Sequence, residues 1–482
     1  MSTATTRRYG SAIRPGLPRI GTSLGIAVGA AVSLAPGLLP RTAGAQAILT
    51  GLLVAVALGL GASMGWALRR GGFGRRGFGG RGFDTARRDG RGAAAGAAAV
   101  VVAVLAWRAG RWQNELRAAM GVAALDPWYW VRCGLGAAVI AGALVLAGRL
   151  GRRAVRALRP GPALVGAVVA ALLGVFVLAP GALEWRMAGY AAADAAPEDA
   201  VAPRVPPPHS GSAESVVAWA DLGTQGRRFV AGADDGPLRV YVGLNSAPDL
   251  RGRVALAVRE LERSGGFTRG NIVVAVPTGS GWIDAGAMAG FARRFGDDVA
   301  VVGLQYANTP SWVSLVCGRD QAVASARALF TAIEDRLAGT AAPPRLFVYG
   351  QSLGAFGGSG VFADAAAQDR RTCAVLWAGP PGNRVHRAGA TVLANSSDPV
   401  VHWSPALLWR APDLTGVRHD APLPRWLPVV SFLQTTVDLL SALDAPAGHG
   451  HRYGTDQGTA LGDCARDHAR TASPAASPVD VG

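Results

Sequence analysis

The sequence has no lysine, so all 48 basic residues are arginines, against 32 acidic residues and a formal net charge of +16. A charge of this size can indicate a nucleic acid or an anionic surface as partner, depending on where the charge lies. Here the arginines stand in a background rich in alanine and glycine, which is more typical of a coding bias than of a phosphate-binding surface. We therefore expect no nucleic-acid partner.

Cysteine is also scarce, with four residues in a chain of 482. Cys133 falls in an apolar segment, where a thiol behaves as a small apolar side chain. Cys317, Cys373 and Cys464 lie in the C-terminal half, where an oxidising compartment would allow one disulfide and leave one thiol, and their spacing does not choose the pair. Because no cluster of cysteines or acidic residues accompanies the histidines, the sequence predicts no metal site and no cofactor.

Charged residues are missing from three long segments, residues 21–40, 42–68 and 160–183. Each segment is near or above the roughly 20 residues that a helix needs to span the hydrocarbon core of a membrane. Residues 92–107 offer only 16 uncharged positions, and residues 128–148 contain one arginine near an end. With these two weaker segments, the sequence predicts about five transmembrane helices. We expect a multi-pass protein of the cell membrane, with the lipid bilayer as its partner.

The arginines sort to two sides if five helices cross the membrane. Seventeen precede the first helix or lie in the second and fourth loops, and five lie on the other side. Because cytoplasmic loops carry an excess of arginine, we expect a cytoplasmic N-terminus and an extracytoplasmic chain after residue 183. As an alternative, the first segment is a signal peptide cleaved at Ala43-Gly44-Ala45, which would leave the side of the C-terminal region unchanged.

Composition divides the chain into four parts. Residues 1–190 form the expected membrane domain, and its second loop, "RRGGFGRRGFGGRGF", has the look of an RNA-binding segment but is better explained as a flexible loop that fixes topology. Residues 191–212 are rich in alanine, proline and acidic residues, which predicts a semi-rigid linker. Residues 213–470 form an expected folded domain, and residues 471–482 a disordered tail.

Short β-branched and aromatic runs alternate with helical patterns in the folded domain. The helical patterns include residues 249–264 and 319–337. This alternation predicts a parallel sheet covered by helices on both faces, with ligands at the carboxyl ends of the strands. The expected strands are residues 238–244, 271–277, 298–306, 345–350, 373–379 and 390–395.

The fourth expected strand runs directly into Gly350-Gln351-Ser352-Leu353-Gly354, which fits the pattern G-x-S-x-G. The two glycines suit a sharp strand-to-helix turn, because side chains there would collide with neighbouring backbone while the serine is held at the sheet edge. The pattern alone occurs often by chance. Between a strand and a helix it indicates that Ser352 is a nucleophile.

A serine nucleophile needs a base, and the base needs a carboxylate that fixes its tautomer, in the chain order Ser, Asp, His for this fold. Asp398 follows the last expected strand, in "NSSDPVV", and is the expected acid. Its alternative role is that of a turn residue before proline. Asp413, Asp420 and Asp438 are weaker rivals because none of them follows a strand.

Two histidines compete for the role of base. His449 and His451 stand in the glycine-rich "AGHGHRYG", after a helix-like stretch at residues 427–443. The glycines suit a loop that brings an imidazole to the nucleophile, and the pattern does not distinguish the two. As an alternative, the pair is a surface or metal-binding histidine tract.

Acyl transfer also needs N–H donors for the oxyanion. The first is the amide of Leu353, which follows the nucleophile. The second is expected from "VPTGSGW", residues 276–282, which follows the second expected strand. Gly279 and Ser280 are the candidates there, unless the segment is an ordinary glycine turn.

Residues 20–460 resemble alpha/beta-hydrolase family 9, actinobacterial proteins in which an N-terminal membrane region precedes a hydrolase domain. The segments that carry the resemblance are "PTGSGWID", "LQYANTPSWVSL", "YGQSLGAFG", "LWAGPP", "SSDPVVHWSPALLWR", "LPVVSFLQ" and "GHGHRY". The resemblance implies an α-helical transmembrane bundle followed by an α/β-hydrolase domain, without a settled substrate. The family pattern has an acidic residue where Gln351 stands and a tryptophan where His402 stands.

The sequence therefore predicts a membrane-anchored serine hydrolase for an ester or thioester, such as a lipid or cell-envelope acyl group. Trp282, Trp403 and Trp409 are the expected substrate contacts, and Trp312, Trp377 and Trp426 stand in nearby motifs. Two alternatives remain: an acyltransferase with the same three catalytic residues, and a non-catalytic protein of envelope assembly or transport.

Overall fold

The computed structural model describes residues 18–70, 81–157, 179–196, 206–232, 236–310, 313–314 and 318–464. Most of the fifth expected span, Trp312, Cys317 and the expected tail lie outside the described residues. The chain divides into two compact units. The first consists of residues 1–36, 40–118 and 123–160, and the second consists of the remaining residues.

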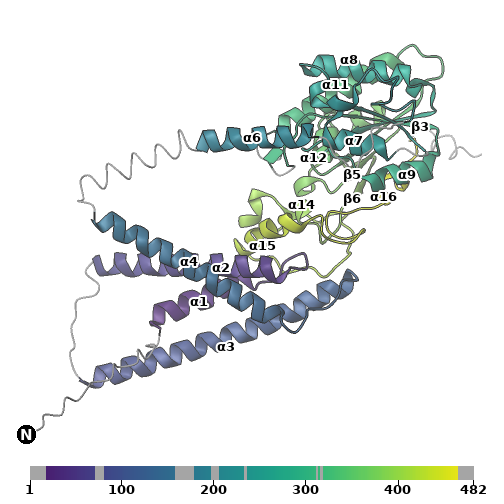
Figure 1. The fold of residues 1–482 in the computed structure, drawn as a ribbon. Helices are drawn as coiled ribbons and strands as arrows, with labels where there is room; N and C mark the ends of the chain where they lie inside the picture. Colours follow the sequence, from purple (N-terminus) through teal and green to yellow (C-terminus); the bar gives the residue numbers. More distant parts are fainter. Residues whose placement is uncertain are drawn as a thin grey trace, which may run out of the picture. The chain divides into compact units, whose positions relative to one another are not determined.

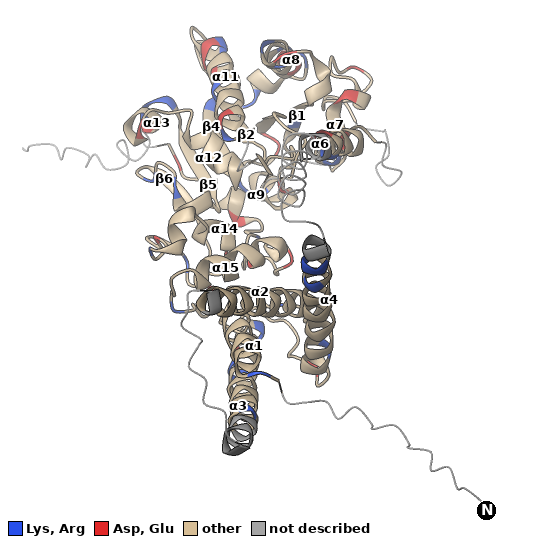
Figure 2. Ribbon diagram, turned by 90° about the vertical axis from the view of Figure 1, so that its left-hand side faces the viewer, with Lys and Arg blue, Asp and Glu red and all other residues tan. Residues whose placement is uncertain are grey.

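The first unit is helical. Three of its described helices are long and apolar enough to cross a membrane, over Ala43–Leu68, Gly90–Ala119 and Tyr129–Arg153. Figure 2 shows basic positions near both ends of α4 and none along its middle, as a membrane-spanning segment requires. The helices are α1 (Ile20–Ser33), α2 (Ala43–Arg70), α3 (Arg81–Ala119) and α4 (Tyr129–Ala157).

Two of the expected spans differ in length from their helices. The first, expected at residues 21–40, is represented by α1, which has 14 residues and is therefore about 21 Å long. It ends before the prolines at positions 36 and 40, because proline cannot continue a helix interior. The third, expected at residues 92–107, lies within α3, which continues through polar sequence to Ala119. The count of five spans stays a prediction.

Glycines allow the helices of this unit to approach closely. A Cβ atom on Gly29 of α1 would lie 2.5 Å from the Cα atom of Val54 on α2. A Cβ atom on Gly51 of α2 would lie 2.8 Å from the side chain of Ile140 on α4. Small residues at helix contacts are typical of membrane bundles, where apolar burial does not drive association and packing must.

The second unit contains a six-stranded parallel sheet in the order β1-β3-β2-β4-β5-β6 (Figure 1). All neighbouring strands pair in parallel. The prediction of six strands is confirmed, and each observed strand lies within its expected run or ends one residue beyond it. The strands are β1 (Leu238–Val242), β2 (Asn271–Val276), β3 (Val299–Leu304), β4 (Arg345–Gln351), β5 (Ala374–Ala378) and β6 (Ala390–Leu393).

Helices cover both faces of this sheet, as predicted. Right-handed crossovers place α8, α11 and α12 on one face, and α9 on the other beside α16 (Figure 1). The central strands β2 and β3 are buried along their whole length, which explains their continuous apolar runs. The helices are α6 (Ala179–Ala195), α7 (Gly223–Ala231), α8 (Leu250–Arg263), α9 (Ala285–Phe295), α11 (Arg319–Leu337), α12 (Leu353–Ser359), α13 (Ala365–Arg371), α14 (Pro399–His402), α15 (Val430–Asp438) and α16 (Asp456–Thr459).

Two segments differ from the sequence expectation. The helix-like stretch at residues 427–443 is divided into α15 and a short 3-10 helix, η7 (Leu439–Ser441). The expected linker at residues 191–212 begins as helix, because α6 continues to Ala195 through an alanine-rich sequence of high helix propensity. Its Asp194 side chain accepts hydrogen bonds from Thr224 N and Gln305 Nε2, which attaches α6 to the rest of the second unit.

Replacing Gly29 with leucine tests the close contact of α1 and α2. A side chain there meets backbone that cannot move aside, so we expect overpacking to cost about 1–3 kcal/mol. The midpoint of thermal unfolding of the full-length protein in detergent should fall by several degrees. Gly134→Leu on α4 is the control, because a Cβ atom there would have no neighbour within 4 Å. Equal midpoints for the two variants would contradict the contact.

Candidate functional site

The turn between β4 and α12 has the geometry of a nucleophile elbow. Ser352 has φ 55° and ψ −125°, a strained backbone conformation for a residue with a side chain. A Cβ atom on Gly350 would lie 2.3 Å from the carbonyl oxygen of Gly354, and one on Gly354 would lie 2.1 Å from that of Val276. Both glycines are therefore required, as the sequence pattern suggested.

Asp398 and His451 form a buried pair beside this turn. Oδ2 of Asp398 lies 2.7 Å from Nδ1 of His451, and both side chains are buried. The amide of Ser352 donates to the carbonyl of Ala378, and a Cβ atom on the next residue, Gly379, would lie 2.5 Å from the His451 ring. The backbone around Ala378 thus connects the elbow with the imidazole.

Nε2 of His451 is buried, and no described residue offers it a hydrogen-bond partner. The opposite ring nitrogen is held by Asp398, so Nε2 is the nitrogen that is free to exchange a proton. An imidazole with one nitrogen on a carboxylate and the other unoccupied has the arrangement of a general base.

Tyr453 is a member of this site that sequence reasoning missed. Its hydroxyl donates to Oδ2 of Asp398 over 2.5 Å, while the amide of Val400 donates to Oδ1 over 2.8 Å. Burial, and then the Asp398 charge, raise the pKa of Tyr453 well above its usual value, so it remains a donor. The spacing of the two residues could have indicated this role, because side chains two positions apart in an extended chain lie on the same face, and Tyr453 is two positions after His451.

His449 belongs to a second pair. Its Nδ1 lies 3.0 Å from Oδ2 of Asp420, so this histidine does not reach Asp398. Asp420 also accepts hydrogen bonds from Ser396 Oγ, Ser397 N and Ser397 Oγ. Ser397 Oγ in turn accepts from the amide of Gly450 over 2.7 Å. The second pair therefore ties the loop of Asp398 to the loop of His451.

The remaining rival acids have other surroundings. Asp413 accepts from the amide and hydroxyl of Thr415 in an exposed turn, and these hydrogen bonds lower its pKa. Asp438 is buried at the end of α15. The described contacts of Asp413 are therefore those of a turn residue, whereas the carboxylates of Asp398 and Asp420 each lie against an imidazole.

Gln351 and His402, the two positions at which the sequence analysis expected a departure from the family pattern, both form hydrogen bonds. Nε2 of Gln351 donates to the carbonyl of His451 over 3.0 Å, a bond that an ionised carboxylate could not make. His402 is buried with Nε2 2.9 Å from the carbonyl of Ser396, so this nitrogen carries the proton and donates. Burial lowers the pKa of His402. Both residues hold loops of the site in place.

The loop after β2 contains two amides of the expected oxyanion site. Gly281 N donates to Thr278 O, and Thr278 N donates to Trp282 O, which closes a tight turn. The amides of Gly279 and Ser280, within that turn, donate to no acceptor in the described part of the chain. Leu353 supplies the first amide of α12, at a helix N-terminus.

Two buried side chains hold the loop after β2 in place through hydrogen bonds to its carbonyl groups. The hydroxyl of Tyr241 donates to the carbonyl of Gly281 over 2.8 Å. Nε2 of Gln305 lies 3.4 Å from the carbonyl of Ser280 and also donates to Asp194. The sequence analysis missed both residues. Tyr241 lies in β1 and Gln305 directly follows β3, so the sequence pattern predicts only a structural role in the core for each.

The expected aromatic contacts are in three different surroundings. Trp282 lines a cavity of about 590 Å³ together with α7 and α9, and the lining of that cavity includes neither Ser352 nor His451. Trp403 follows α14 and donates from Nε1 to Thr436 Oγ1 over 3.0 Å. Trp409 is 68% exposed. Trp377 is fully buried in the core, and Trp426 donates to the carbonyl of Leu407.

Cys373 and Cys464 form a disulfide, a pairing that their spacing left open. It joins the residue before β5 to the end of the described chain, across 91 positions. Cys133 is a buried free thiol within α4, as expected for a small apolar residue. The described residues contain no group of three or more potential metal ligands.

Comparison with known families covers nearly the whole chain. Residues 34–234 match the family model described as the alpha/beta-hydrolase family N-terminus. Residues 238–391 and 384–473 match the one described as the alpha/beta-hydrolase family. No curated protein and no solved structure matches the chain significantly. The resemblance inferred from the motifs is thus confirmed.

His402 generates a prediction about acid stability. Its pKa is lower in the folded protein than in the unfolded chain, where it is about 6.5. The stability from the neutral imidazole is therefore complete above about pH 6.5 and declines as pH falls from there toward the folded value. His402→Gln keeps an N–H donor for the carbonyl of Ser396 and removes the titrating imidazole. When the pH is lowered from about 7.5 to about 5.5, roughly one unit to either side of the unfolded pKa, the thermal midpoint of this variant should therefore fall less than that of the wild type.

The exposed His419 provides the control, and His419→Gln should retain the wild-type dependence on pH. An unchanged pH dependence in His402→Gln would mean that another group governs acid unfolding.

Proposed function

The chain belongs to the alpha/beta-hydrolase family, and from that premise we propose that it is a membrane-anchored serine hydrolase. Ser352 is the nucleophile, His451 the general base and Asp398 the acid of its catalytic triad. The observation that carries this proposal is the unoccupied, buried Nε2 of His451 beside a strained serine turn. His449, the other histidine considered, pairs with Asp420 instead.

The proposed reaction follows from this geometry. Nε2 of His451 accepts the proton of Ser352 Oγ as that oxygen attacks the carbonyl carbon of an ester or thioester. Asp398 stabilises the resulting imidazolium and, with Tyr453, fixes the ring orientation. The imidazolium then protonates the leaving alcohol or thiol. Water, activated by the same imidazole, releases the acid from the acyl-enzyme.

The developing oxyanion needs donors placed before the reaction begins. The amide of Leu353 and an amide of Gly279 or Ser280 are the groups that we assign, because none has another acceptor among the described residues. Removing one such donor typically costs about 10²–10³ in kcat. Gln305 and Tyr241 support this site by holding the loop after β2.

Exposed apolar side chains favour a lipid or cell-envelope acyl group as substrate. Between the acid loop and the base loop, Trp409 is 68% exposed, Leu440 84% and Leu443 51%. Exposed tryptophan and leucine are typical of surfaces that meet lipid or acyl chains. Transfer of the acyl group to an alcohol is the second candidate reaction, and product analysis with and without an added acceptor alcohol separates it from hydrolysis.

We infer that the catalytic unit lies outside the cytoplasm. Two independent features support this: the arginine asymmetry of the membrane region, and the disulfide between Cys373 and Cys464. Disulfides persist in extracytoplasmic compartments and are rare in the cytosol.

Ser352→Ala tests the proposed nucleophile. We expect it to abolish labelling by a fluorophosphonate probe and turnover of a model ester, because the attacking oxygen is gone, while membrane insertion is unchanged. His451→Gln should reduce kcat by about 10³-fold or more, since Nε2 of this imidazole is the proposed base and has no hydrogen-bond partner among the described residues.

His449→Gln is the matched control for the base, and it should lower kcat far less because it disturbs only the connection between loops. Ser404→Ala is the control for probe labelling. Undiminished turnover in Ser352→Ala would overturn the assignment of the nucleophile, and equal losses for the two histidines would overturn that of the base.

Protease accessibility tests the orientation. Added to intact spheroplasts, a protease should cut the proline-rich linker near Val205 and release a fragment that contains Ser352, because the linker lies outside in the five-span topology. Immunoblotting of the supernatant measures this release. A linker that is cut only after the membrane is permeabilised would reverse the orientation.

A further inference from the structure

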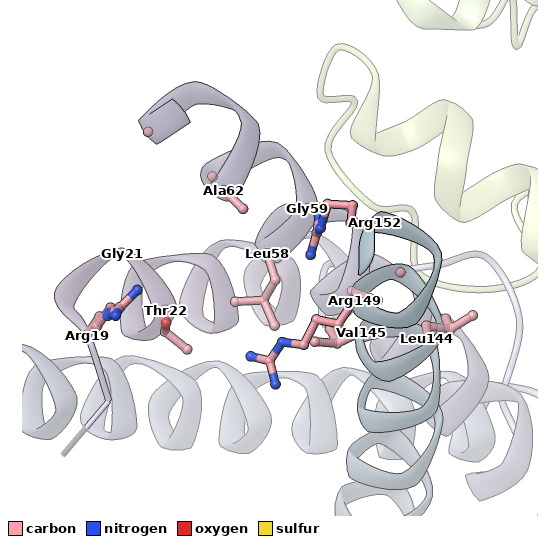
Figure 3. A pocket seen from close by; sticks show the side chains of 14 residues that line it. Arg19, Gly21, Thr22, Leu58, Gly59, Ala62, Leu144, Val145, Arg149 and Arg152 are labelled. Carbon is pink, nitrogen blue, oxygen red and sulfur yellow. The ribbon is translucent and has the colours of Figure 1, made fainter. Parts of the chain in front are cut away.

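The membrane unit contains a cavity that the proposed hydrolase reaction does not use. It has a volume of about 520 Å³ and is lined by the start of α1, the C-terminal half of α2 and the C-terminal part of α4 (Figure 3). This volume lies within the range of about 300–1,000 Å³ that is usual for small-molecule pockets. The cavity is therefore large enough for a lipid headgroup.

Three arginines line this cavity, and its lining has no acidic residue. Arg19 precedes α1, while Arg149 and Arg152 lie at the end of the apolar part of α4. In Figure 3 the Arg149 side chain extends from α4 toward Leu58 of α2. No hydrogen bond or ion pair joins any of the three guanidinium groups to another described residue.

The chemistry of such a cavity favours an anion with oxygen acceptors. A phosphate group matches the arginines because its oxygens accept paired hydrogen bonds from a guanidinium group and its charge is opposite. The N-terminus of α1, where the amides of Ile20 and Gly21 have no acceptor among the described residues, adds positive potential at the same place. Thr22 adds a hydroxyl to the lining.

The position of the cavity at one end of the bundle favours a lipid over a free ion. α1 and α2 run antiparallel, because Gly29 meets Val54 and Gly25 meets Leu58. The start of α1 and the ends of α2 and α4 therefore share the arginine-bearing end, at headgroup depth.

Apolar and small residues complete the lining. Leu58, Leu144 and Val145 offer a surface for an acyl chain beside the arginines. Gly59 leaves the space open, because a Cβ atom there would meet nothing within 4 Å. We propose that this cavity binds the phosphate headgroup of an anionic phospholipid, whose acyl chains lie along α2 and α4. In the five-span topology this end faces the cytoplasm, so the lipid stabilises the membrane unit and is not the substrate.

The test compares full-length protein in phosphatidylcholine vesicles with and without phosphatidylglycerol. The wild type should gain thermal stability as phosphatidylglycerol is added, because a ligand that binds the folded state raises its unfolding midpoint. Arg149→Gln/Arg152→Gln should bind roughly thirtyfold more weakly, which corresponds to about 2 kcal/mol. Gly59→Leu, which fills the cavity without a change of charge, should lose the gain as well.

Arg91→Gln/Arg153→Gln is the matched control, since it removes the same charge from the same end of the bundle but outside the cavity lining. It should retain the gain. Equal losses in the two double variants would show non-specific attraction and overturn the site. A gain from inorganic phosphate alone would identify a free anion and overturn the lipid. No gain in the wild type would also overturn the proposal.

Discussion

Parallel pairing of six strands brings all of their carboxyl ends to one edge of the sheet, and the candidate site depends on that constraint. The elbow follows β4, the loop with Gly279 follows β2, and Asp398 follows β6. These segments are far apart in the chain and meet only because no strand is reversed. Parallel neighbours require crossover connections, which α8, α9, α11 and α12 supply between the first five strands, and these helices cover both faces of the sheet.

At that edge, a carboxylate with three donors organises the loops. Asp398 accepts from His451, Tyr453 and Val400. A buried charge is stable only when its oxygens are satisfied, so each of these bonds also fixes the loop that supplies it. The Asp420–His449 pair adds a second connection between the same two loops. The proposed base is thus oriented before any substrate arrives, as preorganised catalysis requires.

The membrane unit follows a different physical rule. In hydrocarbon, apolar side chains gain little from leaving lipid for protein, so close backbone packing replaces apolar burial as the source of cohesion. Gly29 and Gly51 permit that packing, whereas Gly59 faces open space. Glycine therefore has two functions in this unit. At Gly29 and Gly51 it lets helices approach closely, and at Gly59 it leaves space for the cavity.

The sequence by itself determined the strands, the elbow and the apolar helices, because each is encoded in neighbouring residues. The periodicity of apolar residues, the length of the strands and the G-x-S-x-G spacing are local signals. They located β4 and Ser352 without knowledge of the rest of the chain. Family membership followed from the same motifs. Long apolar runs likewise indicated membrane helices, although α1 proved shorter and α3 longer than charge alone suggested.

Only the tertiary structure decided which histidine meets Asp398, which cysteines pair and that Tyr453 joins the site. His449 and His451 are two positions apart in the same glycine-rich loop, so local patterns describe them equally well. Their difference arises from the path of that loop against two others, which sets one imidazole beside Asp398 and the other beside Asp420. Contacts between segments so far apart depend on how the loops pack at the sheet edge, and no local pattern records that packing.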